Sequence, residues 1–318
     1  MLPDQLYESL ALVESDMEDA PALIPGVLSR EDKIICVAAP KVGKSILAAQ
    51  LASCLAGGHA FFGHMPVPGP HRVLYVAGEG DPHGLRSRGR RMGLVLPVPE
   101  DRLWYWPTPT YPLNTSGGLA QLLAFARDIS PDLTIIDPIY ALMTGSMRDD
   151  EKAGDFVRNI NRFQAETGSA VVIIHHTHRP VKDKDGDRID EDDEAYFGSV
   201  VWAAWPKALW LMRKDGQSRH SVMLSCGTNR DGPNAMERVG LMMSEPKPLL
   251  FVPRGDARLG PTCITMLEAL KVQSDMTQAD LVEWTERPVS TVSEGLGQME
   301  GLGLVKRTTG RPEKWSVT

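Results

Sequence analysis

Four short, almost continuously apolar runs constrain the fold of this chain more than any other feature. They alternate along the chain with segments that have helical spacing. They occupy residues 33–37, 72–77, 133–136 and 170–175. Strands that are apolar on both faces are typical of parallel sheets covered by helices on both sides. The sequence therefore predicts an α/β fold with a mostly parallel sheet. Two closely spaced runs, 208–212 and 220–226, are expected to form an antiparallel edge.

The segments between these runs carry helix signals. Helical spacing is predicted over residues 85–92, 118–129 and 150–167. Ser116 precedes the second of these segments and is its candidate N-cap.

The first apolar run leads into Ala-Ala-Pro-Lys-Val-Gly-Lys-Ser at residues 38–45, and a helical segment follows. A glycine-bearing loop between a strand and a helix is the context of a phosphate-binding P-loop. Gly43 lets the backbone approach a phosphate, Lys44 can reach the β- and γ-phosphates, and Ser45 can ligate Mg²⁺. The full motif begins with a glycine, and in this chain Ala38 stands at that position. Alanine is tolerated there if its φ is negative. The other residues expected to bind the nucleotide are Pro40, Lys41, Val42 and Ile46.

Three further polar side chains follow the ends of apolar runs, where an α/β sheet binds its ligand. Glu79 could orient and deprotonate a water that faces a γ-phosphate. Asp137 follows four apolar residues, as a Walker B carboxylate does, and could hold Mg²⁺ through water or Ser45. His176 could donate a hydrogen bond to the γ-phosphate. Taken singly, Glu79 could also be an acid at a helix N-terminus, and His176 a polar strand end.

Composition excludes several classes of protein. The chain has 318 residues, a net charge of −7 and four scattered cysteines. These features argue against a nucleic-acid coat protein, a disulfide framework and a zinc site, and we expect a cytoplasmic protein. No apolar run is long enough to predict a membrane span, and the acidic N-terminus lacks the layout of a signal peptide. Residues 181–194 hold eight acids and three bases and are expected to form a solvated loop.

The C-terminal part of the chain has a different pattern. Helices are predicted at 262–273, 277–286 and 290–301, followed by a hairpin over 303–317, and Thr277 and Ser290 are candidate N-caps. This order predicts a winged helix-turn-helix. The predicted division is an N-terminal arm (1–22), an ATPase domain (23–255), a linker (256–261) and a winged-helix domain (262–318).

The third of these helices would be the recognition helix of a DNA-binding domain, and the hairpin would be its wing. Gly295 and Gly297 are expected to weaken that helix by about 1 kcal/mol each relative to Ala. Docking of a protein is the alternative use of the same domain. The candidate DNA contacts are Ser290, Thr291, Ser293 and Gln298 on the helix and Lys306, Arg307, Arg311 and Lys314 on the wing.

Together these motifs resemble the RecA/DnaB superfamily of ring-forming P-loop ATPases, and more narrowly the RepA-type hexameric helicases of phages and plasmids (AAA_25-like). The resemblance covers about residues 20–255 and rests on segments 39–45, 77–82, 135–138, 175–178 and 197–199. It implies a RecA-like fold, ATP and Mg²⁺ as ligands, and the roles described above for Lys44, Ser45, Glu79, Asp137 and His176.

The resemblance also implies an arginine finger that acts across the interface between subunits. Arg230 is the first candidate and Arg213 the second; either could complete a neighbour's ATP site. The DnaB branch has a Lys-x-Arg pair here, and Thr228 stands in place of the lysine. The implied assembly is a homo-oligomer, expected to be a hexamer.

The expected function is Mg²⁺-dependent ATP hydrolysis by a ring-shaped motor that acts on DNA, as a replicative helicase of a mobile element. Its expected partners are single-stranded DNA in the ring, duplex DNA at the winged helix and other replication proteins. In the superfamily, the loop after the histidine strand faces the ring centre, and here it holds the acidic residues 181–194, which would repel phosphates. An ATPase switch or helicase loader that acts on proteins, and an ATP-controlled DNA-binding regulator, therefore stay open.

Overall fold

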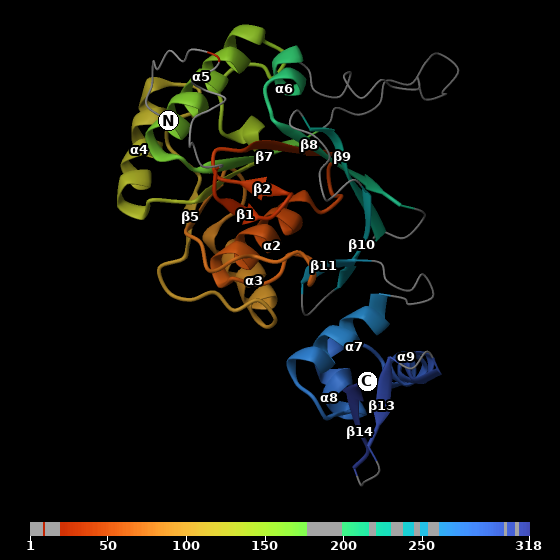
Figure 1. Ribbon diagram of the computed structural model, residues 1–318. Coiled ribbons are helices and arrows are strands. Elements are labelled where there is room, and N and C mark those ends of the chain that lie inside the picture. The colour runs from red at the N-terminus through yellow and green to blue at the C-terminus, as the bar shows by residue number, and fades with distance from the viewer. Residues whose placement is uncertain are drawn as a thin grey trace, which may run out of the picture.

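The computed structural model contains an α/β body and a smaller C-terminal unit (Figure 1). The structure describes residues 9, 20–176, 199–215, 221–229, 238–244, 249–253, 261–301, 304–308 and 312–318. Arg230, Arg311 and the acidic segment 181–194 lie outside the described residues.

A nine-stranded sheet forms the centre of the body, with the order β11-β10-β9-β8-β3-β7-β6-β4-β5. The six strands from β8 to β5 in this order pair in parallel, and β8 to β11 pair antiparallel. A separate two-stranded sheet is formed by β1 (Ala22–Ile24) and β2 (Leu28–Ser29). The strands of the large sheet are β3 (Lys33–Ala38), β4 (Val73–Ala77), β5 (Leu103–Pro107), β6 (Leu133–Asp137), β7 (Ala170–His176), β8 (Ala208–Lys214), β9 (Ser221–Asn229), β10 (Arg238–Ser244) and β11 (Leu250–Pro253).

Helices cover both faces of this sheet. Successive side chains of a strand point to opposite faces. Accordingly, Ile34 and Cys36 of β3 pack in the core with α2 and α3, whereas Ile35 and Val37 pack in the core with α4, α5 and α6. The predicted α/β fold with a mostly parallel sheet is confirmed. The helices are α2 (Lys44–Gly57), α3 (Pro82–Gly93), α4 (Ser116–Ile129), η1 (Ile139–Ala141), α5 (Asp150–Thr167) and α6 (Val200–Ala204).

The antiparallel edge differs from its prediction in extent. β8 pairs with β9 as expected, but it also pairs in parallel with β3 and so joins the two parts of the sheet. β10 and β11 extend the edge and were not predicted. Gly240 and two methionines make β10 a weak strand signal, and the four-residue β11 ends in a proline.

Two helix starts also differ from their predictions. The N-cap of α4 is Thr115, whose hydroxyl accepts a hydrogen bond from the Gly118 N–H at 3.2 Å, so Ser116 is the first helical residue. α9 begins at Val289, which places the predicted cap Ser290 inside the helix. At α4, the adjacent Thr115 and Ser116 can both cap a helix, so sequence alone does not choose between them. At α9 the difference is one residue, within the usual uncertainty of a helix boundary.

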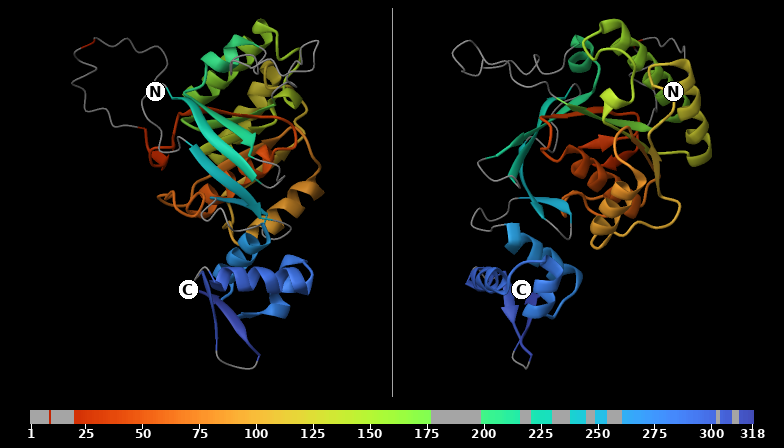
Figure 2. Two further views of the ribbon diagram at one scale, coloured as in Figure 1. Left: turned by 90° about the vertical axis from the view of Figure 1, so that its right-hand side faces the viewer. Right: turned by 180° about the vertical axis from the view of Figure 1, so that it is seen from behind.

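Among the described residues, the C-terminal unit contains three helices and a three-stranded antiparallel sheet with the order β12-β14-β13. Figure 2 shows their arrangement. Thr277 caps α8 in a capping box with Asp280, as predicted. This arrangement is compatible with a winged helix-turn-helix. The elements are α7 (Pro261–Val272), β12 (Met276–Thr277), α8 (Gln278–Thr285), α9 (Val289–Gly301), β13 (Val305–Arg307) and β14 (Lys314–Val317).

Gly295 has a packing role in this unit. A Cβ atom at this position would lie 2.4 Å from Cε of Met266 and 3.2 Å from Sγ of Cys263, both on α7. The missing side chain therefore lets α9 approach α7 closely. Gly297 has open space around it, so only the predicted loss of helix propensity applies there.

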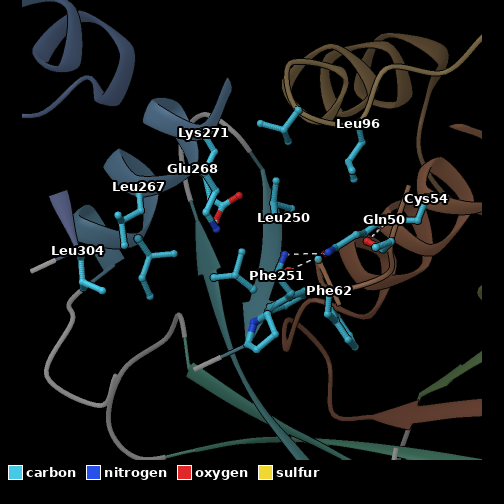
Figure 3. A pocket seen from close by; sticks show the side chains of 16 residues that line it. Gln50, Cys54, Phe62, Leu96, Leu250, Phe251, Leu267, Glu268, Lys271 and Leu304 are labelled. Carbon is cyan, nitrogen blue, oxygen red and sulfur yellow. Dashed lines mark hydrogen bonds and ion pairs between the residues drawn. The ribbon is translucent and has the colours of Figure 1, made fainter. Parts of the chain in front are cut away.

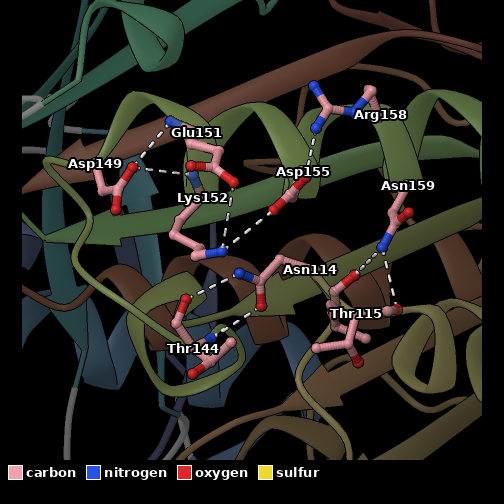
Figure 4. A network of polar contacts seen from close by, with 10 residues as sticks. Asn114, Thr115, Thr144, Asp149, Glu151, Lys152, Asp155, Arg158 and Asn159 are labelled. Atoms are coloured by element: carbon pink, nitrogen blue, oxygen red, sulfur yellow. Dashed lines mark hydrogen bonds and ion pairs between the residues drawn. The ribbon is translucent and has the colours of Figure 1, made fainter.

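A polar network fixes the segments around α4 and α5 (Figure 4). Asn114 and Thr144 exchange two hydrogen bonds of 2.9 Å between the Asn114 side-chain amide and the Thr144 backbone. Asn159 donates to the carbonyl oxygens of Leu113 at 2.8 Å and Thr115 at 3.1 Å. These bonds tie the chain that follows β6 to the start of α4. Within the described residues, no helix is both long and apolar enough to cross a membrane.

The two glycines at the start of α4 give a matched stability test. A Cβ atom at Gly118 would lie 2.0 Å from the Pro112 carbonyl oxygen, whereas one at Gly117 would lie 3.4 Å from the Tyr111 ring. We expect Gly118→Ala to lower the free energy of unfolding by about 2 kcal/mol, because backbone atoms have to move. Gly117→Ala should be neutral or stabilising by up to about 1 kcal/mol. Urea unfolding checks both variants, and equal effects would contradict this packing.

Candidate functional site

The candidate site lies at the carboxyl edge of the four central parallel strands. In the register, Ala38 at the end of β3 lies beside His176 at the end of β7. Ala77 at the end of β4 lies beside Asp137 at the end of β6. The loop after β3 and the Glu79 turn after β4 therefore open onto one edge, as the sequence predicts.

The loop between β3 and α2 has the backbone of a tight turn. Gly43 adopts a φ of 106° and Lys41 a φ of 64°, both in the left-handed region. Ala38 is the last residue of β3, so its extended backbone does not require a glycine. Val42 is buried, Ile46 is half-buried, and Pro40 is exposed.

Lys44 is buried beneath this loop, with 3% of its surface exposed. Its Nζ donates hydrogen bonds to the carbonyl oxygens of Ala38 at 2.7 Å and Ala39 at 2.8 Å. Burial lowers the pKa of the ammonium group to about 8. The side chain thus holds a positive charge against the loop in a poorly solvated place.

Asp137 is the centre of a second buried group. Its Oδ1 accepts a hydrogen bond from Oγ of Ser45 at 3.1 Å, and its Oδ2 accepts one from the Tyr75 hydroxyl. Burial raises the pKa of this carboxyl, while the two hydrogen bonds act in the opposite direction. A hydroxyl and a carboxylate side by side are hard oxygen donors, the kind that Mg²⁺ prefers. The donor set therefore fits Mg²⁺ that also binds phosphate and water.

A polar cavity of about 240 Å³ opens beside these residues. The polar residues that line it include Ser45, Tyr75, Asp137, Glu79 and Arg88. Glu79 is exposed, so a water molecule can reach its carboxylate. Arg88, on α3, was not predicted. It follows the buried Leu85 by three residues, which places the two on one helix face and could have identified it.

His176 is half-buried at the end of β7. Burial, with a contribution from the charge of Lys44, lowers the pKa of its imidazole to about 4. The ring therefore carries no charge at neutral pH. It packs edge-on against the ring of Tyr140, with 5.2 Å between the centroids.

The two candidate fingers differ in what the structure shows. Arg213 is exposed near the carboxyl end of β8, two residues beyond Leu211, which pairs with Val37 of β3. It therefore lies at the same edge as the P-loop. Arg230 lies outside the described residues.

The predicted DNA contacts lie on α9 and on the wing formed by β13 and β14, in the C-terminal unit (Figure 2). On α9, Ser290, Ser293 and Gln298 are exposed and Thr291 is half-buried; on the wing, Lys306 and Lys314 are exposed. Arg307 instead pairs with Glu300 at 3.3 Å and Glu313 at 3.4 Å, and its guanidinium lies 5.3 Å from the Trp315 ring centroid. Glu300, which lies on α9, therefore compensates the charge of Arg307 on the wing. Arg311 lies outside the described residues.

The sequence and the fold are similar to those of known proteins. The AAA_25 family, described as an AAA domain, matches residues 7–180, more than half of the chain. The DNA repair protein RadA of Brucella abortus (strain 2308) is 26% identical over 187 residues, which are 53% of this chain and 35% of RadA. The chain therefore spans about a third of the length of that relative.

Two solved structures share the fold. A DnaB-like replicative helicase, solved with its interactions with primase, superposes with a TM-score of 0.56 and 14% identity over 78% of this chain and 68% of that one. The ATPase domain of G40P gives a TM-score of 0.51 and 13% identity over 67% of this chain and 82% of that one. These likenesses show a RecA-like fold.

The Tyr75–Asp137 contact gives a stability prediction. Tyr75→Phe leaves Oδ2 of a buried carboxylate without its donor, so we expect the free energy of unfolding at pH 7 to fall by about 2 kcal/mol. Because burial already raises the pKa of Asp137, loss of the hydrogen bond raises it further. The destabilisation should therefore shrink as the pH falls and Asp137 becomes protonated in the folded state.

Tyr105→Phe is the matched control, because this neighbouring ring lies 5.3 Å from Tyr75 without bonding Asp137 in the described contacts. Its effect should stay below about 0.5 kcal/mol at every pH. Urea unfolding from pH 5 to pH 8 makes the comparison. A pH-independent cost of Tyr75→Phe would contradict the assigned contact.

Proposed function

Because the chain belongs to the AAA_25 family of AAA domains, we propose that it is a Mg²⁺-dependent ATPase that acts on DNA as a ring-shaped motor. The observation that carries this proposal is the pairing of Ser45 with Asp137 at 3.1 Å, directly beside the P-loop and the buried Lys44. We assign residues 23–255 to the ATPase domain and residues 262–318 to a winged-helix domain joined by the linker 256–261.

Lys44 and Arg88 supply the positive charge that a triphosphate requires. The ammonium group of Lys44 now bonds two loop carbonyl oxygens, and phosphate oxygens are stronger acceptors for the same donors. Arg88 lines the cavity from α3, whereas Lys44 belongs to α2, and Arg88 can contact the terminal phosphates. Pro40, Lys41, Val42, Gly43 and Ile46 complete the loop around the phosphates.

Mg²⁺, when bound, would neutralise charge on the phosphates, and Ser45 and Asp137 would hold it. Glu79 orients a water molecule and accepts its proton, because its carboxylate is exposed on the cavity wall. His176 is uncharged at neutral pH, so it hydrogen-bonds the terminal phosphate without adding charge. The arginine finger comes from a neighbouring subunit, with Arg230 as first and Arg213 as second candidate.

The proposed substrate of the motor is DNA. The relative RadA is named as a DNA repair protein, and one structural neighbour is named as a replicative helicase. We propose a homo-oligomer, a hexamer in the helicase form, that encloses single-stranded DNA. The C-terminal unit contacts duplex DNA through α9 and the wing, where Lys306 and Lys314 are exposed.

A second candidate function follows from the eight acids of residues 181–194. If this segment faces single-stranded DNA in the centre of a ring, its negative charge repels the phosphates and opposes binding. The candidate is an ATPase switch or helicase loader that acts on protein partners.

Replacement of Glu79 tests the hydrolysis step. Glu79→Gln should lower kcat for ATP by at least about 100-fold, because the base is lost, and leave the affinity for Mg²⁺·ATP within about twofold. Glu100→Gln, an exposed acid in the loop before β5, should change neither value. Phosphate release and equilibrium nucleotide binding measure the two quantities. Unchanged turnover in Glu79→Gln would remove this residue from the mechanism.

A forked DNA duplex separates the motor from the switch. A helicase should displace one strand with ATP and Mg²⁺, and Lys44→Ala should abolish displacement because phosphate binding is lost. Particle mass is measured with and without ATP and single-stranded DNA. We expect it to rise to that of a ring when they are present. ATP hydrolysis without strand displacement would favour the switch, and a monomer under all conditions would contradict the ring.

A further inference from the structure

β11 lies at the far edge of the large sheet, yet it contacts the helix that follows the P-loop. Four strand pairings separate β11 from β3. Nevertheless, Gln50 of α2 donates through Nε2 to the Phe251 carbonyl oxygen at 2.7 Å and accepts from the Phe251 N–H through Oε1, also at 2.7 Å (Figure 3). One amide side chain thus satisfies both backbone groups of Phe251, as a neighbouring strand would.

The aromatic ring of Phe251 also contacts the P-loop. A Cβ atom at Gly43 would lie only 2.7 Å from Cζ of Phe251 and 3.8 Å from Cε of Met212. Phe251 is fully buried, and Gln50 is 2% exposed. The ring therefore occupies the space next to Gly43, whose backbone would approach the phosphates of a bound nucleotide. It limits how far the loop can move on that side.

The C-terminal unit contacts the antiparallel pair of strands β10 and β11. Ser244 of β10 and Thr265 of α7 share a buried hydrogen bond of 2.9 Å. A cavity of about 470 Å³ lies between the two units. Residues of α2 and β11 line one side, and Leu267, Glu268 and Lys271 of α7 line the other (Figure 3). α7 is thus attached to the hairpin of β10 and β11, which Gln50 and Phe251 attach to α2.

We propose that Gln50 and Phe251 are positioning residues that hold the P-loop in its phosphate-binding shape and couple its occupancy to the C-terminal unit. This inference rests on the proposed nucleotide binding. A phosphate that engages the Gly43 backbone fixes the loop against the Phe251 ring, and the Gln50 amide transmits the restraint to β11. Release of the nucleotide loosens both contacts, so the attachment of α7 responds to the state of the site.

Gln50→Glu tests the link with little change of size. It places an oxygen atom opposite the Phe251 carbonyl oxygen, so that hydrogen bond is lost and two acceptors face each other. We expect about tenfold weaker binding of a fluorescent, non-hydrolysable ATP analogue with Mg²⁺, the change expected for one unpaired buried group. Ser53→Ala is the control, because Ser53 lies one turn later on α2 and bonds Met92.

Amide hydrogen exchange separates coupling from simple stabilisation. In the wild-type chain, the analogue should slow exchange in the P-loop, in β11 and in α7. In Gln50→Glu at saturating analogue, the P-loop should still slow, while β11 and α7 should not. A purely structural role would speed exchange equally with and without the analogue and leave the difference intact, which would overturn the inference.

Phe251→Leu is a second variant that keeps both backbone hydrogen bonds and removes the ring from Gly43. It should also weaken analogue binding, with a thermal midpoint closer to wild type than that of Gln50→Glu. Wild-type affinity in both variants would overturn this inference and leave the proposed function intact. A wild-type chain that binds no nucleotide would overturn both.

Discussion

The site depends on the parallel register of four strands. β3 pairs with β7, β7 with β6 and β6 with β4, without a register shift within these pairings. A slip of one residue would turn each apolar side chain to the other face of a sheet that is buried on both sides. The register that satisfies the two cores therefore also brings the P-loop, Asp137 and His176 to one edge. Packing of the core and placement of the site are one constraint.

At that edge, charged groups are held where water is scarce. Lys44 and Asp137 are both buried. Burial lowers the pKa of Lys44 and raises that of Asp137, and both shifts favour the neutral form of the group. Lys44 donates hydrogen bonds to the loop carbonyl oxygens, and Asp137 accepts hydrogen bonds from Ser45 and Tyr75. These hydrogen bonds offset the cost of burial. Phosphate oxygens would replace the loop carbonyl oxygens as acceptors for Lys44, and weak screening by solvent would strengthen the interactions of these buried charges.

Sequence predicted the parts of the site that belong to periodic patterns. Apolar runs located the strands, and the residues just after them included Glu79, Asp137 and His176. Contacts made by residues that look like ordinary core escaped prediction. Tyr75 reads as one more apolar strand position, and its hydroxyl matters only because β4 and β6 are neighbours. Gln50 and Phe251 are 201 residues apart, and β11 itself has a weak strand signal. Such contacts depend on how β11, at the edge of the large sheet, packs against α2. No local sequence pattern specifies this packing.

The charge state of the wing bears on how the C-terminal unit would respond to salt. With Arg307 engaged by Glu300 and Glu313, Lys306 and Lys314 are the wing cations, among those described, that remain for phosphates. Each phosphate contact releases counterions and adds about −0.9 to the slope of log affinity against log salt. Two contacts give a slope of about −2, which is shallow for a DNA-binding protein. A fourfold rise in salt would therefore weaken attachment through this wing roughly 12-fold, against about 10³- to 10⁵-fold for a protein with about 6–10 phosphate contacts.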